Sequence, residues 1–289
     1  TRMRAFRVPP MFWLMGRLAL GITKPRHAIP GMEMAGDVVE VGANVTRFSV
    51  GDAVMAGTSH EAGGYAEFRC FPEDSMMAHK PANLDYPEAA ALPVGGLTAL
   101  YFFQRGKLER GQKILINGAS VSVGTYAVQI AHHWGAEVTG VCSGANVELV
   151  KSLGADHVID YKTEDFTQNG EVYDVIFDTV GNTTFSRVRK SLKPDGMYLH
   201  AVLVNAAIRA AWVGLISDVT FIGGTPTQNL PREKLIENLN LLTEMVESGA
   251  IKPVIDRTYD LDEIVEAHRY VDTGRKRGNV VIRVGEDSA

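Results

Sequence analysis

A turn bounded by two glycines is the part of this sequence best suited to chemistry. Residues 113–117 form an apolar run of strand length, and the turn from Gly118 to Gly124 follows at once. From Val123 onward apolar residues recur at helical spacing, and residues 137–142 have the composition of a second strand. The first backbone N–H groups of a helix face anions, and the helix dipole favours negative charge there. The segment therefore predicts a βαβ unit that holds the phosphates of a nucleotide cofactor.

The turn matches the usual dinucleotide fingerprint only in part. That fingerprint has the form G-x-G-x-x-G, and here Val121 and Ser122 stand where glycine normally lets a pyrophosphate approach. As a pattern alone, the turn fits an ordinary connection between a strand and a helix equally well. The rest of the sequence has to decide between the two interpretations.

Composition and charge restrict the class of protein. The chain has 289 residues, enough for one large or two ordinary domains, with 45% hydrophobic and 22% charged residues. A net charge of −5 argues against a nucleic-acid-binding surface. Only Cys70 and Cys142 are present, which excludes a disulfide framework and a zinc ribbon and fits a reducing cytoplasm. The apolar segments 10–22 and 201–216 contain polar and charged residues, so no membrane span is expected.

Three regions that differ in their pattern of expected strands and helices follow one another along the chain. The first contains short segments broken by Gly and Pro, typical of antiparallel barrel strands, at 36–42, 52–55 and 65–70. The second alternates strands with helices, and its expected strands are 113–117, 137–142, 157–160, 173–179, 197–203 and 219–222. The third contains an expected helix at 231–248, a strand at 251–256, a helix at 261–271 and a strand at 279–284.

The alternation in the middle region predicts an α/β fold with a doubly wound parallel sheet. The simplest topology places this sheet as an insert between two parts of the barrel domain. We therefore expect residues 1–95 to form the first part of a substrate domain, residues 96–224 the cofactor domain, and residues 225–289 the return to the substrate domain.

Short motifs spread in order over nearly the whole chain carry a family resemblance. They are residues 31–36 with Gly42, 50–54, 64–68, 89–93, 95–100, 152–156 with 160–161, and 267–269 with 278–282. Together they resemble the medium-chain dehydrogenase/reductase superfamily, in its zinc-less quinone oxidoreductase-like branch. The resemblance implies a Rossmann sheet inserted in a GroES-like antiparallel β-barrel domain. In the family several strands precede the position of Gly31, so an N-terminally shortened barrel is expected.

The same resemblance bears on metal binding. Zinc-dependent members of the superfamily carry Gly-His-Glu at the position of residues 31–33, and that histidine binds the catalytic zinc. Here Met32 takes its place, and a thioether is a poor zinc ligand beside imidazole and thiolate. His60 followed by Glu61 is interpreted as a solvent-exposed pair in a glycine-rich loop rather than a metal site. No metal is expected.

NADP(H) is favoured over NAD(H) as the cofactor. NAD-specific sites usually place a carboxylate at the end of the second strand, and here none occurs before Glu148. Ser143 and Asn146 could bond a ribose 2′-phosphate, although they could equally cap the next helix. The resemblance places Tyr161 near the adenosine. No strong cation follows the strand, so the expected preference for NADPH is modest.

The remaining site residues are implied by the resemblance. Thr98 would lie beside the nicotinamide, although a bond from its hydroxyl to its own helix backbone is the alternative. The full set of expected cofactor contacts is Thr98, Gly118, Ala119, Ser120, Val121, Ser122, Val123, Ser143, Asn146, Tyr161, Val180, Leu203, Lys276, Gly278 and Asn279. No catalytic residue is assigned, because Tyr65, the best candidate on family position, has a core tyrosine as its alternative.

The expected reaction is hydride transfer from NADPH to a quinone or an activated enone, a small-molecule substrate, without zinc. One alternative is a zinc-independent alcohol or carbonyl dehydrogenase. Another is a non-catalytic NADP(H)-binding redox sensor. Family members commonly pair through the edge strand of the sheet, so a homodimer is expected.

Overall fold

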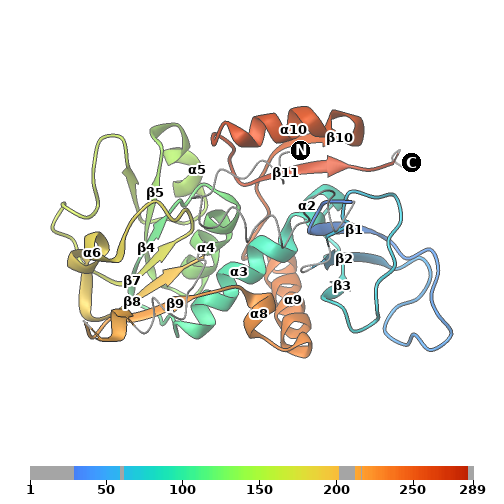
Figure 1. The fold of residues 1–289 in the computed structure, drawn as a ribbon, viewed down its shortest axis with the longest axis horizontal. Coiled ribbons are helices and arrows are strands. Elements are labelled where there is room, and N and C mark those ends of the chain that lie inside the picture. Colours follow the sequence, from blue (N-terminus) through green and yellow to red (C-terminus); the bar gives the residue numbers. More distant parts are fainter. Residues whose placement is uncertain (1–28, 59–61, 202–211, 216, 286–289) are drawn as a thin grey trace.

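The computed structural model describes residues 29–58, 62–201, 212–215 and 217–285. Its largest element is a six-stranded sheet with the strand order β6-β5-β4-β7-β8-β9, in which all neighbouring pairs are parallel (Figure 1). The strands are β4 (Lys113–Asn117), β5 (Glu137–Cys142), β6 (His157–Asp160), β7 (Tyr173–Asp178), β8 (Leu192–His200) and β9 (Thr220–Gly223). This confirms the expected doubly wound α/β fold.

The sheet is buried on both faces, which explains the uninterrupted apolar runs of its strands. In β4, Ile114 and Ile116 join the core on one face, while Leu115 joins the core on the other face. Residue side chains alternate across a strand, so a strand covered on both sides needs apolar residues at every position.

The helices are α2 (Tyr86–Ala90), α3 (Leu92–Arg105), α4 (Ser122–His133), α5 (Val147–Ser152), α6 (Phe185–Val188), α8 (Pro226–Asn229), α9 (Arg232–Glu247) and α10 (Ile264–Asp272).

Two smaller sheets lie to the right of the large sheet in Figure 1, one on the far side of α3 and α9 and the other along the top, beside α10. One is antiparallel and consists of β1 (Glu33–Asp37), β2 (Ala53–Gly57) and β3 (Met77–His79). The other is a parallel pair of β10 (Ile255–Asp260) and β11 (Asn279–Arg283). Among the described residues no helix is long and apolar enough to cross a bilayer.

Two of the expected barrel strands are wrong in position. The strand expected at 36–42 is β1 and ends at Asp37, after which the chain turns. The segment 65–70 is a series of bends and loop, and the third strand is β3 instead. Gly63 has φ +102° just before that segment, so the backbone turns away where a ladder would have to begin.

The third region follows the expectation more closely. The helix expected at 231–248 is α9, and Gly249 follows it with φ +75°. The strand expected at 251–256 begins only at Ile255, because Pro253 has no N–H to donate to a ladder. Helix α3 runs across the expected division at residues 95 and 96, and the domain boundaries stay a prediction.

Candidate functional site

The glycine turn lies at the carboxyl edge of the sheet, directly after β4. Gly118 has φ +84°, a conformation that favours glycine. A Cβ added there would lie 2.3 Å from Val180 Cγ2, so the turn also leaves no room for a side chain at this position. A Cβ on Gly124 would lie 2.0 Å from the Gly118 carbonyl oxygen. Both glycines that the sequence retains are therefore required by geometry.

The two positions that depart from the fingerprint are tolerated by the backbone. Val121 is the N-cap residue of α4, with φ −85° and ψ 172°, which is ordinary extended backbone. Glycine at position 121 would let the pyrophosphate of a cofactor come close to the backbone, but the turn itself does not require it. The fingerprint is thus degraded where a pyrophosphate would come near and intact where the chain must fold.

The start of α4 offers donors for an anion. The side chain of Val121 makes no cap hydrogen bond. Within the described chain, the backbone N–H groups of Ser122, Val123 and Gly124 have no acceptor. Three such groups at the positive end of a twelve-residue helix suit the oxygens of a phosphate. The residues present therefore fit a dinucleotide.

The C-terminal return segment closes onto this turn. The Gly278 N–H donates to the Ser120 carbonyl oxygen at 2.8 Å, and Val121 and Gly278 form an isolated parallel bridge. Gly278 has φ +53°, and a Cβ there would lie 2.2 Å from the Val254 carbonyl oxygen. Lys276 Nζ donates to the Gly278 carbonyl oxygen at 2.7 Å. Ser120 and Gly278, which are 158 positions apart in sequence, are thereby brought together, as the resemblance implies.

The neighbourhood of Ser120 also includes the loop after β5. Asn146 Nδ2 donates to Ser120 Oγ at 3.0 Å, and both side chains are buried. Ser143 and Asn146 occupy the N-cap positions of the two short helical segments after β5, as the capping alternative expects, but neither side chain makes a cap hydrogen bond. Ala119, fully buried, donates its N–H to the Val141 carbonyl oxygen at 2.9 Å. The turn and the second strand thus form one hydrogen-bonded unit.

The other expected contacts differ in how the structure presents them. Thr98 Oγ1 donates to the Val94 carbonyl oxygen at 2.7 Å within α3, which is the alternative considered for this residue. Val180 and Tyr161 are exposed at the strand ends. Asn279 donates its backbone N–H to the Val254 carbonyl oxygen at 2.8 Å. Leu203 lies outside the described residues.

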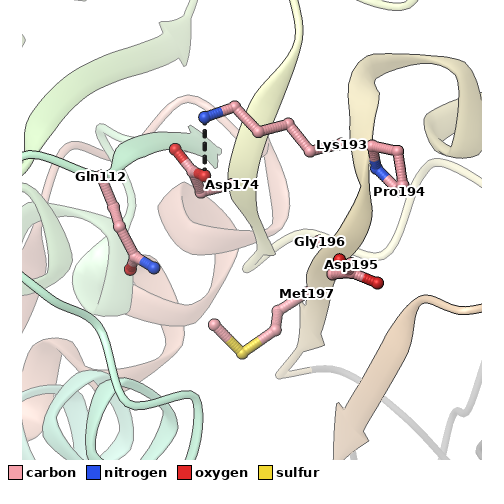
Figure 2. Close-up of a pocket in the computed structure, with 7 residues that line it drawn as sticks. All are labelled: Gln112, Asp174, Lys193, Pro194, Asp195, Gly196 and Met197. Carbon is pink, nitrogen blue, oxygen red and sulfur yellow. Dashed lines mark hydrogen bonds and ion pairs between the residues drawn. The ribbon is translucent and has the colours of Figure 1, made fainter.

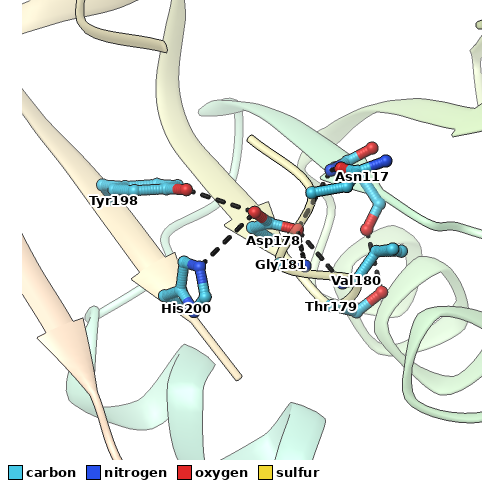
Figure 3. Close-up of polar contacts among 8 residues, drawn as sticks. Asn117, Asp178, Thr179, Val180, Gly181, Tyr198 and His200 are labelled. Carbon is cyan, nitrogen blue, oxygen red and sulfur yellow. Dashed lines mark hydrogen bonds and ion pairs between the residues drawn. The ribbon is translucent and has the colours of Figure 1, made fainter. Parts of the chain in front are cut away.

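A buried carboxylate that the sequence interpretation missed holds the strand ends in place (Figure 3). Asp178, the last residue of β7, has no exposed surface. Its Oδ1 accepts from Asn117 Nδ2 at 3.0 Å and from the N–H groups of Val180 and Gly181 at 3.0 and 2.9 Å. Its Oδ2 lies 3.6 Å from His200 Nε2 on β8. Asp178 therefore positions Val180. In the sequence, the signal for this role was an acidic residue at the end of an otherwise apolar strand.

A second overlooked carboxyl group joins the small sheet to α3. Glu33 Oε1 on β1 accepts from the Val94 N–H at 2.6 Å. Burial of the carboxyl group raises its pKa to about 8, against the opposing effects of hydrogen bonds from Val94 and Gly95 and of the charge of Lys276. Burial in turn lowers the pKa of Lys276. Glu33 thus holds its proton at neutral pH in the folded protein.

A wide concavity next to β1 offers room for a small molecule. Its lining includes Met32, Glu33, Tyr65 and Asn279. Tyr65 is half-buried, and its ring meets that of His268 edge-on at 6.2 Å between centroids. Among the residues that the structure describes, no three His, Cys, Asp or Glu side chains are grouped to hold a metal ion, and His60 and Glu61 fall outside that part.

A smaller hollow lies at the opposite, amino edge of the sheet (Figure 2). Both carboxylate oxygens of Asp174 are already engaged there. Oδ2 accepts from the Lys113 N–H at 2.8 Å, and Oδ1 forms an ion pair with Lys193 at 2.7 Å. Because ligands of wound sheets bind at the carboxyl edge, this hollow is not the functional site.

A turn suited to a phosphate at the carboxyl edge of a doubly wound sheet, closed by a segment from a small β domain, is the arrangement of a dinucleotide-binding protein. Family models agree: an alcohol dehydrogenase GroES-like domain matches residues 11–82, and a zinc-binding dehydrogenase model matches residues 153–282.

Individual relatives narrow the family. The chain is 33% identical to the chloroplast envelope quinone oxidoreductase homolog of Arabidopsis thaliana, over 97% of this chain and 88% of that protein. It is 34% identical to the 2-methylene-furan-3-one reductase of Solanum lycopersicum, over 89% of this chain and 64% of that protein. The solved quinone oxidoreductase of Coxiella burnetii superposes with a TM-score of 0.82 at 28% identity, covering 96% and 87% of the two chains. The chain belongs to the medium-chain dehydrogenase/reductase superfamily, in its quinone oxidoreductase-like branch, and is an oxidoreductase that uses a nicotinamide cofactor.

Proposed function

We propose that this protein reduces a quinone or an activated enone with hydride from NADPH, without zinc. The observation that carries the proposal is the anion-binding start of α4, closed by the return segment through the bond from Gly278 to Ser120. When bound, the cofactor supplies the hydride. The protein supplies binding and orientation and excludes water, so that the acceptor and the nicotinamide meet face to face.

Each part of the site has a task in this proposal. The free N–H groups of α4 bind the pyrophosphate, and Ser143 faces the ribose 2′-phosphate. Thr98 and Val180 border the nicotinamide. Lys276, by bonding the Gly278 carbonyl oxygen, shapes the return segment, and the bond from the Gly278 N–H to the Ser120 carbonyl oxygen holds that segment against the turn. Protons for the reduced acceptor come from solvent, so the proposal needs no general acid.

The acceptor class is supported by the relatives and by the concavity beside β1. One relative is named a quinone oxidoreductase homolog and another a reductase of an enone. The concavity is lined by more apolar than polar surface, as planar conjugated acceptors require. A homodimer in a reducing cytoplasm completes the proposal, and light scattering of the purified protein tests its oligomeric part.

Zinc independence rests on Met32, whose thioether cannot replace the histidine of the zinc enzymes. We expect a strong chelator to leave NADPH oxidation unchanged. Loss of activity on chelation, with recovery on adding Zn²⁺, would instead identify a metal enzyme.

The decisive experiment has two stages. Purified protein is titrated with NADPH and NADH, following nicotinamide fluorescence, and then assayed for NADPH oxidation with quinones, enones and aldehydes. Binding with turnover of a quinone or enone supports the proposal. Turnover of aldehydes alone favours a carbonyl reductase, binding without turnover favours a redox sensor, and no binding refutes the cofactor site.

A further inference from the structure

The carboxyl end of β6 brings an acidic side chain to the loop that follows β5. Asp160 and Cys142, the last residues of the two strands, are paired in register. A Cβ added to Gly144 would lie 2.5 Å from Asp160 Oδ2. Burial, and after it the charge of Asp160, raises the pKa of the Cys142 thiol to about 11. The carboxylate therefore lies directly against the backbone of Gly144.

A tight turn holds this carboxylate in place. Asp160 Oδ1 accepts from the Lys162 N–H at 3.0 Å, and the Asp160 carbonyl oxygen accepts from the N–H groups of Thr163 and Glu164. Oδ2, the oxygen nearer Gly144, has neither an ion-pair nor a hydrogen-bond partner among the described residues. Lys162 and Glu164, the other charged residues of the turn, are exposed. An asparagine could form the same turn without the charge.

The place of this carboxylate gives it a function. In wound sheets the loop after the second strand recognises the 2′ position of the adenosine ribose, and that loop here is the one containing Ser143 and Gly144. The acid is usually sought at the end of the same strand, where this chain has none. The neighbouring strand β6 supplies one instead.

We propose that Asp160 is the residue that discriminates between the two nicotinamide cofactors, accepting the ribose 2′-hydroxyl of NADH and repelling the 2′-phosphate of NADPH. The inference rests on the proposed function and deepens it. Asp160 works against the preference for NADPH and makes it small, so that the protein uses both cofactors. Two unit charges about 3 Å apart in water change a binding constant by about tenfold, and Asp160 and the ribose 2′ position both lie at the solvent-accessible edge of the sheet.

The test compares the wild type with Asp160→Asn and with Glu164→Gln, which removes the same charge from the same turn. Each is titrated with NADPH and with NADH. Asp160→Asn is expected to bind NADPH about tenfold more tightly, with NADH binding changed by less than about threefold. Glu164→Gln is expected to leave the ratio of the two dissociation constants unchanged. Thermal melting of each variant checks that the fold is intact.

Several results separate this inference from the function on which it rests. If both cofactors bind and Asp160→Asn leaves their ratio unchanged, or Glu164→Gln shifts it equally, the role of Asp160 is refuted and the reductase proposal stands. If the wild type binds neither cofactor, both fail. In the wild type alone, added salt should screen the repulsion and improve NADPH binding relative to NADH. A relative loss of NADPH binding would contradict the inference even if Asp160→Asn did not fold.

Discussion

Replacing Glu33 with glutamine should stabilise the protein at alkaline pH and change its stability little near pH 5. Burial raises the pKa of this carboxyl group from 4.5 to about 8. The folded protein therefore keeps the proton between those two values, while the unfolded chain loses it. Because the folded state binds more protons, the free energy of unfolding falls as pH rises through this interval.

The magnitude follows from the size of the pKa shift. The difference between about 8 and 4.5 is 3.5 units, and at 1.36 kcal/mol per unit this is about 5 kcal/mol at most. The loss accumulates between about pH 4.5 and pH 8 and is complete above pH 8. Glutamine resembles the protonated acid at every pH, and its amide oxygen can still accept from the Val94 N–H. The variant avoids the loss, so its advantage grows with pH.

The assay is urea unfolding of the wild type, Glu33→Gln and the control Glu40→Gln at pH 5, 7 and 9. Glu40 is an exposed carboxylate just after the same strand β1. We expect the difference between Glu33→Gln and the wild type to be below about 1 kcal/mol at pH 5 and to reach several kcal/mol at pH 9. A difference independent of pH, or one that the Glu40 control reproduces, would refute the reasoning.

Two further predictions concern the carboxyl edge of the large sheet. Gly124→Ala should abolish nucleotide binding and destabilise the fold by about 3 kcal/mol, because its Cβ would lie 2.0 Å from the Gly118 carbonyl oxygen. Fluorescence titration and urea unfolding measure the two effects. Gly36→Ala is the control, because a Cβ at Gly36 would meet no atom within 4 Å. Asp178→Asn should cost about 3 kcal/mol of stability and raise the KM for NADPH. The buried carboxylate accepts several hydrogen bonds and positions Val180, and an amide has only one oxygen to accept them. Unchanged stability and KM would show that the charge of the carboxylate is dispensable.

The positions of the wound-sheet elements could be read from local patterns. Strands buried on both faces need apolar residues throughout, and α9 shows its apolar stripe at helical spacing, so both were visible in the sequence. The barrel strands were less predictable. An edge strand depends on the partner that pairs with it, and the segment 65–70 has strand composition but makes no ladder among the described residues.

The sequence by itself determined the βαβ unit and the two glycines that its turn cannot replace. These are properties of residue type and short spacing. Only the tertiary structure decided where the ionisable groups lie: Asp160 against Gly144 from a neighbouring strand, and the carboxyl group of Glu33 on β1 against the Val94 N–H at the start of α3. The physical reason is that desolvation and Coulomb interaction depend on distance in space, and the contacting groups here are separated by up to tens of residues along the chain.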